Sequence, residues 1–527
     1  MHLSRKSHLG TEIFNSLRSA PFREFICDYG LTKKKKFSRG LTLSLALLFT
    51  DELRRRTPKE KRIGVVLPAS FAGILANISI FLSGRIPVNL NFTLGSDINE
   101  EIIKRANIKT IITASRMVEK FSSFPWGLNR ILIDDSLREI SARTPKILVT
   151  YLMILIRPQW VWAKHKVALQ GGEETAVLLF TSGSSGNPKG VPLSHSNILA
   201  NCRQILALDL FKPKHKVLLN LPLFHSFGLS IGMLFSTLRG MTLVCTPSPL
   251  DSKLSIKAIK GEGVDIILGT PTFLRGYLKY ANQDELSSIQ YVVAGAERSP
   301  RHLIEKWETE VGCEYLEGYG LTETSPAISF NLVGSHKKYG SVGRILAGIE
   351  CRTIDPHTGK KTSLDTGGIL CFKGPNIFSG YWNDPDRSMG VLSSDGWFRT
   401  GDLGRVDRDG FLWIEGRESR FSKIGGEMVP HGRIEEELMD VLNLQVGDEP
   451  QLVVVATLDE QKGEKLLVLS SLDLTIEQIK SGLQKKGIPN LWIPRECIKV
   501  KSIPLLGTGK VDWRSIKSMV LNRTSNY

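Results

Sequence analysis

The segment from Leu178 to His195 (LLFTSGSSGNPKGVPLSH) holds the residue types that a phosphate-binding loop requires. An apolar run typical of a buried strand leads directly into a loop of glycines and hydroxyl side chains, which ends at a lysine. Glycines let backbone N–H groups approach phosphate oxygens, hydroxyls donate further hydrogen bonds, and a lysine offsets negative charge. We therefore expect this loop to bind polyphosphate through Thr181, Ser182, Gly183, Ser184, Ser185, Gly186 and Lys189.

This pattern differs from the phosphate loop of GTPases and kinases, whose signature is GxxxxGK[ST]. The nearest match, at Gly509-Lys510, has Pro504 in place of the first glycine and Val511 in place of the serine or threonine. The sequence therefore predicts a phosphate loop of another family.

The motif GYGLTETSP, from Gly318 to Pro326, carries three side chains suited to a nucleotide. The ring of Tyr319 can stack on a purine, and the hydroxyl of Thr322 can donate to a phosphate oxygen. Glu323 supplies the hard carboxylate oxygen that Mg²⁺ prefers. We expect this motif to bind nucleotide and metal together.

Two later residues complete the predicted chemistry. Asp402, in RTGDLG, accepts hydrogen bonds only when it is ionised, so it suits a pair of ribose hydroxyls, and we expect it on a turn. Lys510, in PLLGTGKVD, lies on a glycine-flanked loop, where a compact positive charge can be delivered when it is needed.

These motifs occur in an order that resembles the adenylate-forming superfamily of acyl-CoA synthetases, luciferases and nonribosomal adenylation domains. The resemblance covers nearly the whole chain. It implies a ligase that uses ATP and Mg²⁺ to turn a carboxylate into an acyl-adenylate, and then passes the acyl group to a thiol. The five motifs are the loop at 178–195, GYGLTETSP, RTGDLG, GRESRFSKIGGEMV (416–429) and PLLGTGKVD (504–512).

The resemblance also implies roles in nucleotide binding and catalysis. It assigns Thr322, Glu323 and Lys510 to catalysis, with Glu323 as the metal ligand and Lys510 as the bridge between the carboxylate and the α-phosphate. Arg417 would contact the ribose and phosphate. Three residues of the AGAE segment would hold the edge of the adenine, namely Gly295, Ala296 and Glu297.

Further residues match the family's acyl pocket and its moving parts. His225, in LPLFHSFG, and Thr270, in GTPTFL, correspond to walls of the acyl pocket. Ser419 matches the hinge about which the small domain rotates, where the family usually has Asp or Lys. Lys423 and Gly426 match the segment that faces the active site during thiol transfer.

The sequence says less about which acid is activated and which thiol accepts the acyl group. Apolar residues around His225 suit a long alkyl chain, although core packing would give the same pattern. The segments RFSKIGGEMVPHG and PLLGTGKVD resemble those of the ligase half of bacterial 2-acylglycerophosphoethanolamine acyltransferase/acyl-[acyl-carrier-protein] synthetases. We therefore expect a long-chain fatty acid to be transferred to the phosphopantetheine of acyl carrier protein, with a long-chain acyl-CoA synthetase as the alternative.

Two other classes of protein are disfavoured. A noncatalytic lipid-binding protein would not need the five charged residues Lys189, Glu323, Asp402, Arg417 and Lys510. A phospholipid acyltransferase would carry an H-x₄-D motif ahead of the ligase motifs, and none precedes them.

The amino-acid composition limits the classes of partner and the cellular compartment that we expect. Lysine and arginine total 69 against 53 acidic residues, a formal net charge of +16, which suits an anionic partner such as a nucleotide, membrane headgroups or an acidic carrier protein. Nucleic acid is not expected, because no helix-turn-helix, zinc-finger or RNA-binding signature occurs. Seven widely spaced cysteines indicate neither a zinc site nor a disulfide framework, so we expect a reducing cytoplasm.

The apolar run Ile147–Ile156 (ILVTYLMILI) leaves one alternative open. Aromatic and basic residues follow it, as in a segment that lies in a membrane interface, which would place the protein at the inner face of the cytoplasmic membrane. A strand or helix buried in the core is the other interpretation, because a run of ten residues cannot be assigned by periodicity.

The elements that position these residues are those of an α/β protein. Short β-rich runs alternate with helical segments through the first 330 residues, which predicts sheets covered by helices. Glycine-rich turns between about 340 and 416 predict a small β-rich region, and the last hundred residues an α+β unit. We expect an N-terminal adenylation domain at 1–418 and a small mobile domain at 419–527.

Overall fold

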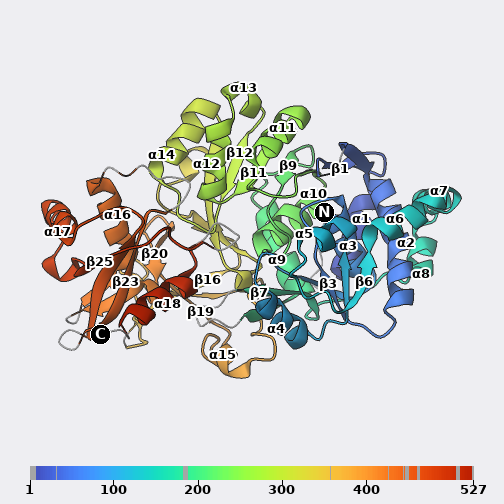
Figure 1. Cartoon of the computed structure of the whole chain (residues 1–527). Helices are drawn as coiled ribbons and strands as arrows, with labels where there is room; N and C mark the ends of the chain where they lie inside the picture. The colour runs from blue at the N-terminus through green and yellow to red at the C-terminus, as the bar shows by residue number, and fades with distance from the viewer. Residues whose placement is uncertain are drawn as a thin grey trace.

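The protein is an α/β structure of helix-covered sheets, as predicted (Figure 1). The computed structural model describes residues 7–30, 33–181, 188–356, 358–424, 427–442, 444, 450–459, 463–505 and 511–524. The predicted phosphate-loop residues Ser182–Gly186, together with Gly426 and Lys510, lie outside the described residues.

The largest sheet of the described chain has nine strands in the order β15-β14-β13-β12-β11-β9-β10-β1-β2. Its central strands are parallel, and β14, β15 and β2 pair antiparallel at the two sides. Because parallel strands end at the same edge of a sheet, the loops after neighbouring strands β12 and β13 meet there. The strands are β1 Glu24–Asp28, β2 Lys35–Ser38, β9 Lys216–Leu219, β10 Thr242–Cys245, β11 Ile266–Gly269, β12 Tyr291–Ala294, β13 Glu314–Gly320, β14 Ala327–Phe330 and β15 Arg344–Ile345.

A second, parallel sheet and a two-stranded ribbon lie beside it. The sheet has the order β4-β3-β5-β6, and the antiparallel ribbon β7-β8 carries the predicted phosphate loop between its strands. The apolar strand predicted before that loop is confirmed as β7, which is buried along most of its length. These strands are β3 Arg62–Val65, β4 Ile86–Asn89, β5 Thr110–Thr113, β6 Asn129–Leu132, β7 Thr175–Thr181 and β8 Lys189–Ser194.

Helices cover these sheets (Figure 1). Several begin at a serine, threonine, asparagine or aspartate whose side chain accepts a backbone N–H of the first turn, as at Ser38, Ser70, Ser194 and Thr270. The α-helices of this part are α1 Leu9–Arg18, α2 Arg39–Arg56, α3 Phe71–Leu82, α4 Ser96–Ala106, α5 Ser115–Lys120, α6 Ile133–Ala142, α7 Thr144–Ile156, α8 Pro158–Lys164, α9 His195–Leu206, α10 Ser236–Arg239, α11 Ser252–Glu262, α12 Pro271–Tyr280, α13 Gln283–Leu286 and α14 Arg301–Lys306.

The β-rich region predicted between about 340 and 416 is a five-stranded antiparallel sheet of order β17-β16-β18-β19-β20. Positive-φ glycines turn its strands, as at Gly410, where φ is 83°. Its elements are β16 Glu350–Ile354, β17 Lys361–Thr362, β18 Gly368–Lys373, helix α15 Pro385–Met389, β19 Phe398–Val406 and β20 Leu412–Arg417.

The end of the chain has the predicted α+β pattern, on the left of Figure 1. Two apolar clusters there are made only of residues between Ile424 and Val520, whereas the clusters of the sheets above end at Leu412. A domain boundary before Ser419 stays a prediction. The elements are β21 Phe421–Ile424, β22 Glu427–Pro430, α16 His431–Val441, β23 Leu452–Asp459, β24 Gly463–Ser470, α17 Ile476–Lys485, β25 Glu496–Lys499 and α18 Trp513–Thr524.

The apolar run Ile147–Ile156 forms most of α7, and the interpretation of it as a buried core element is wrong. Only Thr150 and Ile154 are buried in this helix, because one side alone packs against α2. Leu148 and Ile156 are each 63% exposed. In the part of the chain that the structure describes, no helix is long and apolar enough to cross a bilayer.

Two histidines in ring contact, tilted by 40° to each other, join the N-terminal helix to the motif of the phosphate loop. The rings of His8 and His195 lie 3.9 Å apart between centroids, and both residues are buried. The backbone N–H of Leu9 donates to Nδ1 of His195 at 3.0 Å, and that of Gly10 donates to Nδ1 of His8 at 3.0 Å. Burial lowers the pKa of His8 to about 4 and that of His195 to about 3. Both rings are therefore neutral at neutral pH.

This pair makes stability depend on pH. The unfolded chain binds a proton at a histidine below about pH 6.5, whereas the folded chain does so only near pH 4 and pH 3. The stabilisation is fully present above pH 6.5 and is lost as the pH falls toward 3. His195→Phe keeps an aromatic ring but removes the acceptor of the buried Leu9 N–H. We therefore expect the free energy of unfolding at pH 7 to fall by about 1–3 kcal/mol and to depend less on pH.

Urea unfolding of both proteins at pH 7 and pH 5 measures these two effects. His336→Phe, at an exposed histidine, is the control and should change neither. Equal stability of His195→Phe and the unaltered protein at both pH values would contradict the neutral buried pair.

Candidate active site

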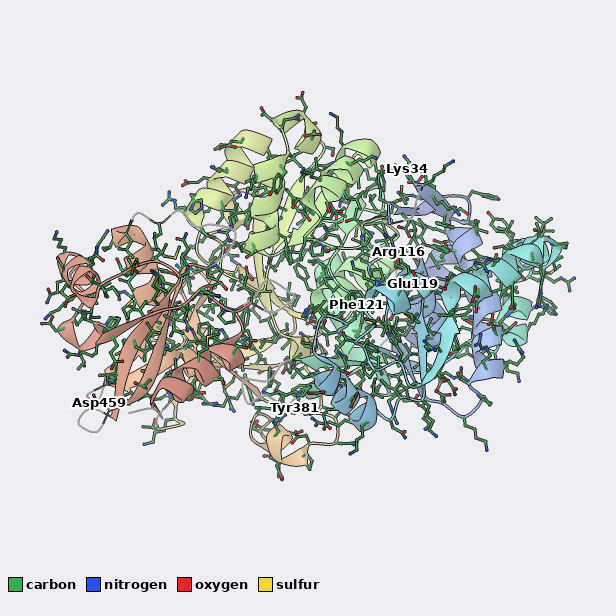
Figure 2. The ribbon with its side chains drawn as sticks, viewed as in Figure 1. Lys34, Arg116, Glu119, Phe121, Tyr381 and Asp459 are labelled. Carbon is green, nitrogen blue, oxygen red and sulfur yellow. The ribbon has the colours of Figure 1, made fainter. Side chains whose placement is uncertain are left out.

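One cavity of 3120 Å³ collects most of the predicted site residues. Its lining comes from all three larger sheets of the N-terminal part and from the C-terminal part. Arg116, Phe121 and Tyr381 all contribute to its wall. In Figure 2, Arg116 and Phe121 lie among the N-terminal helices, and Tyr381 lies near α15. The predicted residues that line it are Thr181, Lys189, His225, Thr270, Gly295, Ala296, Glu297, Tyr319, Thr322, Glu323, Arg417 and Ser419.

The predicted ribose-binding aspartate is not itself a lining residue, but its chain neighbours Thr400 and Gly401 and its partner Arg417 line the cavity. Asp402 is in strand β19 and is buried, so its expected position on a turn is wrong. Its carboxylate accepts a hydrogen bond from the Tyr319 hydroxyl at 2.6 Å and pairs with Nε of Arg417 at 2.8 Å. Asp402 and Arg417 are directly opposite on β19 and β20, which explains why two motifs far apart in the sequence meet.

This triad is electrostatically coupled. Burial, together with the negative charge of Asp402, raises the pKa of Tyr319 well above its ordinary value, so the phenol stays protonated and donates. The same carboxylate raises the pKa of Arg417. Tyr319 thus positions Asp402, a contact that the expected stacking on a purine does not include.

A second group surrounds the predicted metal ligand. Glu323 lies in a single 3₁₀ turn, η3 (Thr322–Thr324), directly after β13. The hydroxyl of Tyr381 donates to Oε1 of Glu323 at 2.9 Å, and Nζ of Lys189 lies 5.3 Å from the centre of the Tyr381 ring. Burial lowers the pKa of Lys189, and the negative charge of Glu323 opposes that shift.

The group fits a magnesium ion that is shared with phosphate. Mg²⁺ usually keeps one or two protein carboxylates and takes its other ligands from phosphate and water. Among the described residues, no cluster of three or more His, Cys, Asp or Glu could hold a metal by itself. Glu323 would supply the carboxylate, and Lys189 the positive charge beside the phosphates.

Sequence reasoning missed Tyr381, although it contacts both Glu323 and Lys189. It stands in FSGYW, a segment interpreted only as part of the β-rich region, and 58 residues separate it from Glu323. No local spacing links the two, so only a tyrosine near a carboxylate in a folded structure could have revealed it.

Two hydroxyls join the nucleotide side of the cavity to its apolar side. Oγ1 of Thr322 and Oγ of Ser226 are 3.3 Å apart. Ser226 follows His225 and precedes a π-helix, η1 (Phe227–Phe235), whose Phe227, Ile231 and Phe235 line the apolar part of the cavity. His225 lines the cavity beside Phe224, with 5.0 Å between their ring centroids.

The predicted adenine segment follows β12. Ala296 adopts a φ of 70°, which is uncommon for a residue with a side chain. Glu297 accepts a hydrogen bond from Thr272 at 2.9 Å, and Thr270 caps α12 by accepting from the N–H of Phe273. The turn is therefore fixed against the start of α12, which precedes it in the chain, at the edge where the loops of β12 and β13 meet.

The predicted hinge residue lies between two oppositely directed ion pairs. Ser419 is the middle residue of a 3₁₀ turn, η5 (Glu418–Arg420). Glu418 pairs with Arg399 at 2.8 Å, on β19. Arg420 pairs with Glu435 at 2.6 Å, on α16, and its guanidinium lies 3.8 Å from the centre of the Trp513 ring.

The structure also places the residues on either side of the undescribed segments. Thr181 and Lys189 are paired across the β7-β8 ribbon, so both ends of the predicted phosphate loop are held together. Leu505 and Val511 form a β-bridge on either side of the segment with Lys510. Lys423 lies on β21, and its side chain is outside the described atoms.

We expect Asp402→Asn to weaken ATP binding. An amide has one acceptor oxygen and donates through its nitrogen, so it cannot accept from Tyr319, Arg417 and a ribose together. Loss of a hydrogen bond to a charged group costs about 1.5–3 kcal/mol, so the KM for ATP should rise about 10- to 100-fold. The ATP dependence of pyrophosphate exchange measures this change.

Asp407→Asn is the matched control, because Asp407 pairs with Lys338 outside the cavity. An unchanged KM for ATP in Asp402→Asn would exclude a role for this carboxylate in binding the ribose.

Tyr381→Phe should raise the Mg²⁺ concentration that the enzyme needs, while the aromatic ring stays in the site. It keeps the ring beside Lys189 and removes the hydrogen bond to Glu323, which contributes about 0.5–1.5 kcal/mol. The Mg²⁺ concentration for half-maximal activity should rise about two- to tenfold, as measured by magnesium titration at saturating ATP. Tyr339→Phe removes a similar hydrogen bond, to Glu308 at 2.6 Å, outside the cavity. A magnesium response equal to that of this control would contradict the positioning role of Tyr381.

Comparison with known proteins shows the family of the chain. Residues 52–382 match the family model described as AMP-binding enzyme. A mitochondrial medium-chain acyl-CoA ligase of Rattus norvegicus is 27% identical over 492 residues, covering 86% of this chain and 78% of the relative. A long-chain-fatty-acid–CoA ligase of Bacillus subtilis is 33% identical over 346 residues, covering 64% of this chain and 60% of the relative.

A solved structure shows the same fold. ATP-bound MatB of Rhodopseudomonas palustris superposes with a TM-score of 0.79 at 21% identity, covering 96% of this chain and 98% of that one. The family match covers more than half of the chain, and enzymes of this family use ATP with Mg²⁺. The chain therefore belongs to the AMP-binding enzymes and is an ATP-dependent ligase that forms acyl-adenylates.

Proposed function

We propose that the chain activates a medium- or long-chain fatty acid and transfers its acyl group to a phosphopantetheine thiol. One observation carries this proposal: a single cavity joins the polar groups around Asp402 and Glu323 to an apolar arm. The apolar arm is lined by Val217, Phe227, Ile231, Phe235, Leu268, Val293 and Phe330.

The apolar arm favours an alkyl chain. It runs along the π-helix η1 and the ends of the central strands, and Thr322 and Ser226 mark the point where it meets the nucleotide side. Each buried CH₂ group contributes about 0.8 kcal/mol, so kcat/KM should rise about fourfold per added carbon until the arm is filled. The two acyl-CoA ligases named above act on medium- and long-chain acids, which supports this class of substrate.

In the proposed first step, a carboxylate oxygen forms a bond to the α-phosphorus while the bond to pyrophosphate breaks. The side chains orient the reactants and offset charge, and none of them becomes covalently bonded. Asp402 and Arg417 hold the ribose, Gly295–Glu297 the adenine edge, and Thr322 and Glu323 the phosphates. Lys510 bridges the carboxylate and the α-phosphate.

In the proposed second step, the thiol sulfur attacks the acyl carbon, AMP leaves and the thiol proton passes to solvent. The thiol needs the place of Lys510, so the part of the chain after residue 418 rotates about Ser419. The separate apolar clusters on either side of this residue support two domains, 1–418 and 419–527. Lys423 and Gly426 then face the thiol.

Coenzyme A is the acceptor that the relatives support, because both are named as acyl-CoA ligases. A carrier protein is the second candidate. The residues of the last two motifs favour it, and so does the net charge of +16, which suits an acidic partner protein. Both acceptors present the same phosphopantetheine thiol, so the site chemistry is shared. Seven free cysteines support a reducing compartment, which we take to be the cytoplasm.

Transfer of radiolabelled palmitate with ATP and Mg²⁺ distinguishes the two acceptors. Holo-carrier protein and coenzyme A are offered in parallel, and we expect a product on at least one of them. Lys510→Ala should lower the adenylation rate about 10²–10³-fold, because it removes a preorganised contact to the transition state. Product on coenzyme A alone assigns an acyl-CoA ligase, and product on the carrier alone an acyl-carrier-protein synthetase.

Lys501→Ala, at an exposed lysine nearby, is the control for Lys510→Ala and should keep full activity. Pyrophosphate release with short aromatic acids but with no fatty acid of any length would contradict the proposed substrate class.

A further inference from the structure

Helix α7 presents an apolar ridge to solvent at the end of the molecule opposite the C-terminal part (Figure 1). The ridge residues occur at the i, i+1, i+4, i+7 and i+8 positions that share one helix face. Their side chains are between 39% and 63% exposed. The ridge consists of Leu148, Val149, Leu152, Leu155 and Ile156.

The other face of α7 fixes this orientation. Thr150 and Ile154 are buried, and the ring of Tyr151 packs directly over Gly40 of α2. A Cβ atom at Gly40 would lie 2.5 Å from that ring, so only glycine allows the two helices to approach this closely. The ridge therefore points outward because the opposite face is locked to the body of the protein.

The stretch of sequence that contains the ridge is basic. No aspartate or glutamate occurs between residues 140 and 172. Five basic residues of this stretch are exposed, and they stand on both sides of the ridge in the sequence. They are Arg143, Lys146, Arg157, Lys164 and Lys166.

Aromatic side chains accompany the ridge. Trp160 of α8 is 45% exposed, and Nζ of Lys164 lies 4.5 Å from the centre of its ring. Phe22 is 76% exposed and lies on the side of α7 that packs against α2, with its ring centroid 6.0 Å from that of Tyr151. Exposed aromatic rings beside lysines and arginines are typical of segments that lie at the level of lipid headgroups.

We propose that α7 and α8 form a docking surface for an anionic lipid bilayer, with the ridge inserted among the acyl chains. Apolar side chains with basic flanks match anionic headgroups above a hydrocarbon layer, whereas an acidic protein partner would match the charges but not the ridge. The proposal goes beyond the ligase function and does not depend on the identity of the acid or of the thiol.

The cavity extends toward this surface. Leu137 and Ser141 of α6 line it, and α7 begins three residues after Ser141. A protein docked through α7 would therefore hold one wall of its cavity close to the bilayer, where long-chain fatty acids are most concentrated.

Co-sedimentation of the full chain with vesicles tests the docking surface. The vesicles are phosphatidylcholine with or without phosphatidylglycerol. We expect binding to the anionic vesicles only, weakened by high salt because the basic flanks are exposed. Leu152→Glu/Leu155→Glu should weaken binding at least tenfold, and Lys146→Gln/Arg157→Gln about fivefold for each charge removed.

Met389→Glu is the matched control, because Met389 is 72% exposed on α15, far from the ridge in sequence and in Figure 1. It should bind vesicles like the unaltered protein. Both leucine substitutions lie on the exposed face, so the double variant should also keep acyl-adenylate formation in vesicle-free solution.

Three results would overturn the proposal. One is the absence of binding to anionic vesicles, and another is equal binding by the leucine variant. The third is a dimer in solution that the leucine substitutions dissociate, which would make the ridge an interface between two copies. Loss of the ligase function would leave vesicle binding unchanged, so the two proposals fail independently.

Discussion

The buried carboxylate of Asp402 is the constraint around which the site is assembled. A desolvated carboxylate must be paired, because leaving it without partners in the interior is costly. Its partners come from different sheets: Tyr319 from the end of β13 in the nine-stranded sheet, and Arg417 from β20 in the five-stranded sheet. Pairing one buried charge thus links the two sheets beside the cavity.

The other polar groups repeat this arrangement on a smaller scale. Tyr381, which follows β18, donates to Glu323 after β13, and Lys189 of the β7-β8 ribbon lies over the same tyrosine ring. Each contact joins elements that belong to different sheets. The site is therefore built where different sheets meet. Its residues are spread along the sequence because each sheet contributes one member of a contacting pair.

Local sequence patterns predicted the elements whose formation depends on neighbouring residues. The apolar run before the phosphate loop predicted β7, and the glycine-rich turns predicted a β-rich region, which is the five-stranded sheet that contains Asp402. Asp402 was expected on a turn, but pairing with β20 extends strand β19 through it. Tyr381 was missed because its contact with Glu323 exists only after folding. The exposure of α7 was likewise decided by its packing on α2, which no periodicity in ten apolar residues encodes.

The two ion pairs on either side of Ser419 have a mechanical consequence. Glu418 is tied to the sheet that precedes it, and Arg420 to the helix and ring that follow it. A change in the backbone torsions of Ser419 therefore breaks neither pair. Arg298 and Glu436 form a pair that spans this point, at 2.7 Å, and both are more than half exposed, so water screens their attraction. Of these three ion pairs, the proposed rotation about Ser419 would therefore have to break only the exposed one, and neither of the two better-shielded pairs beside the hinge.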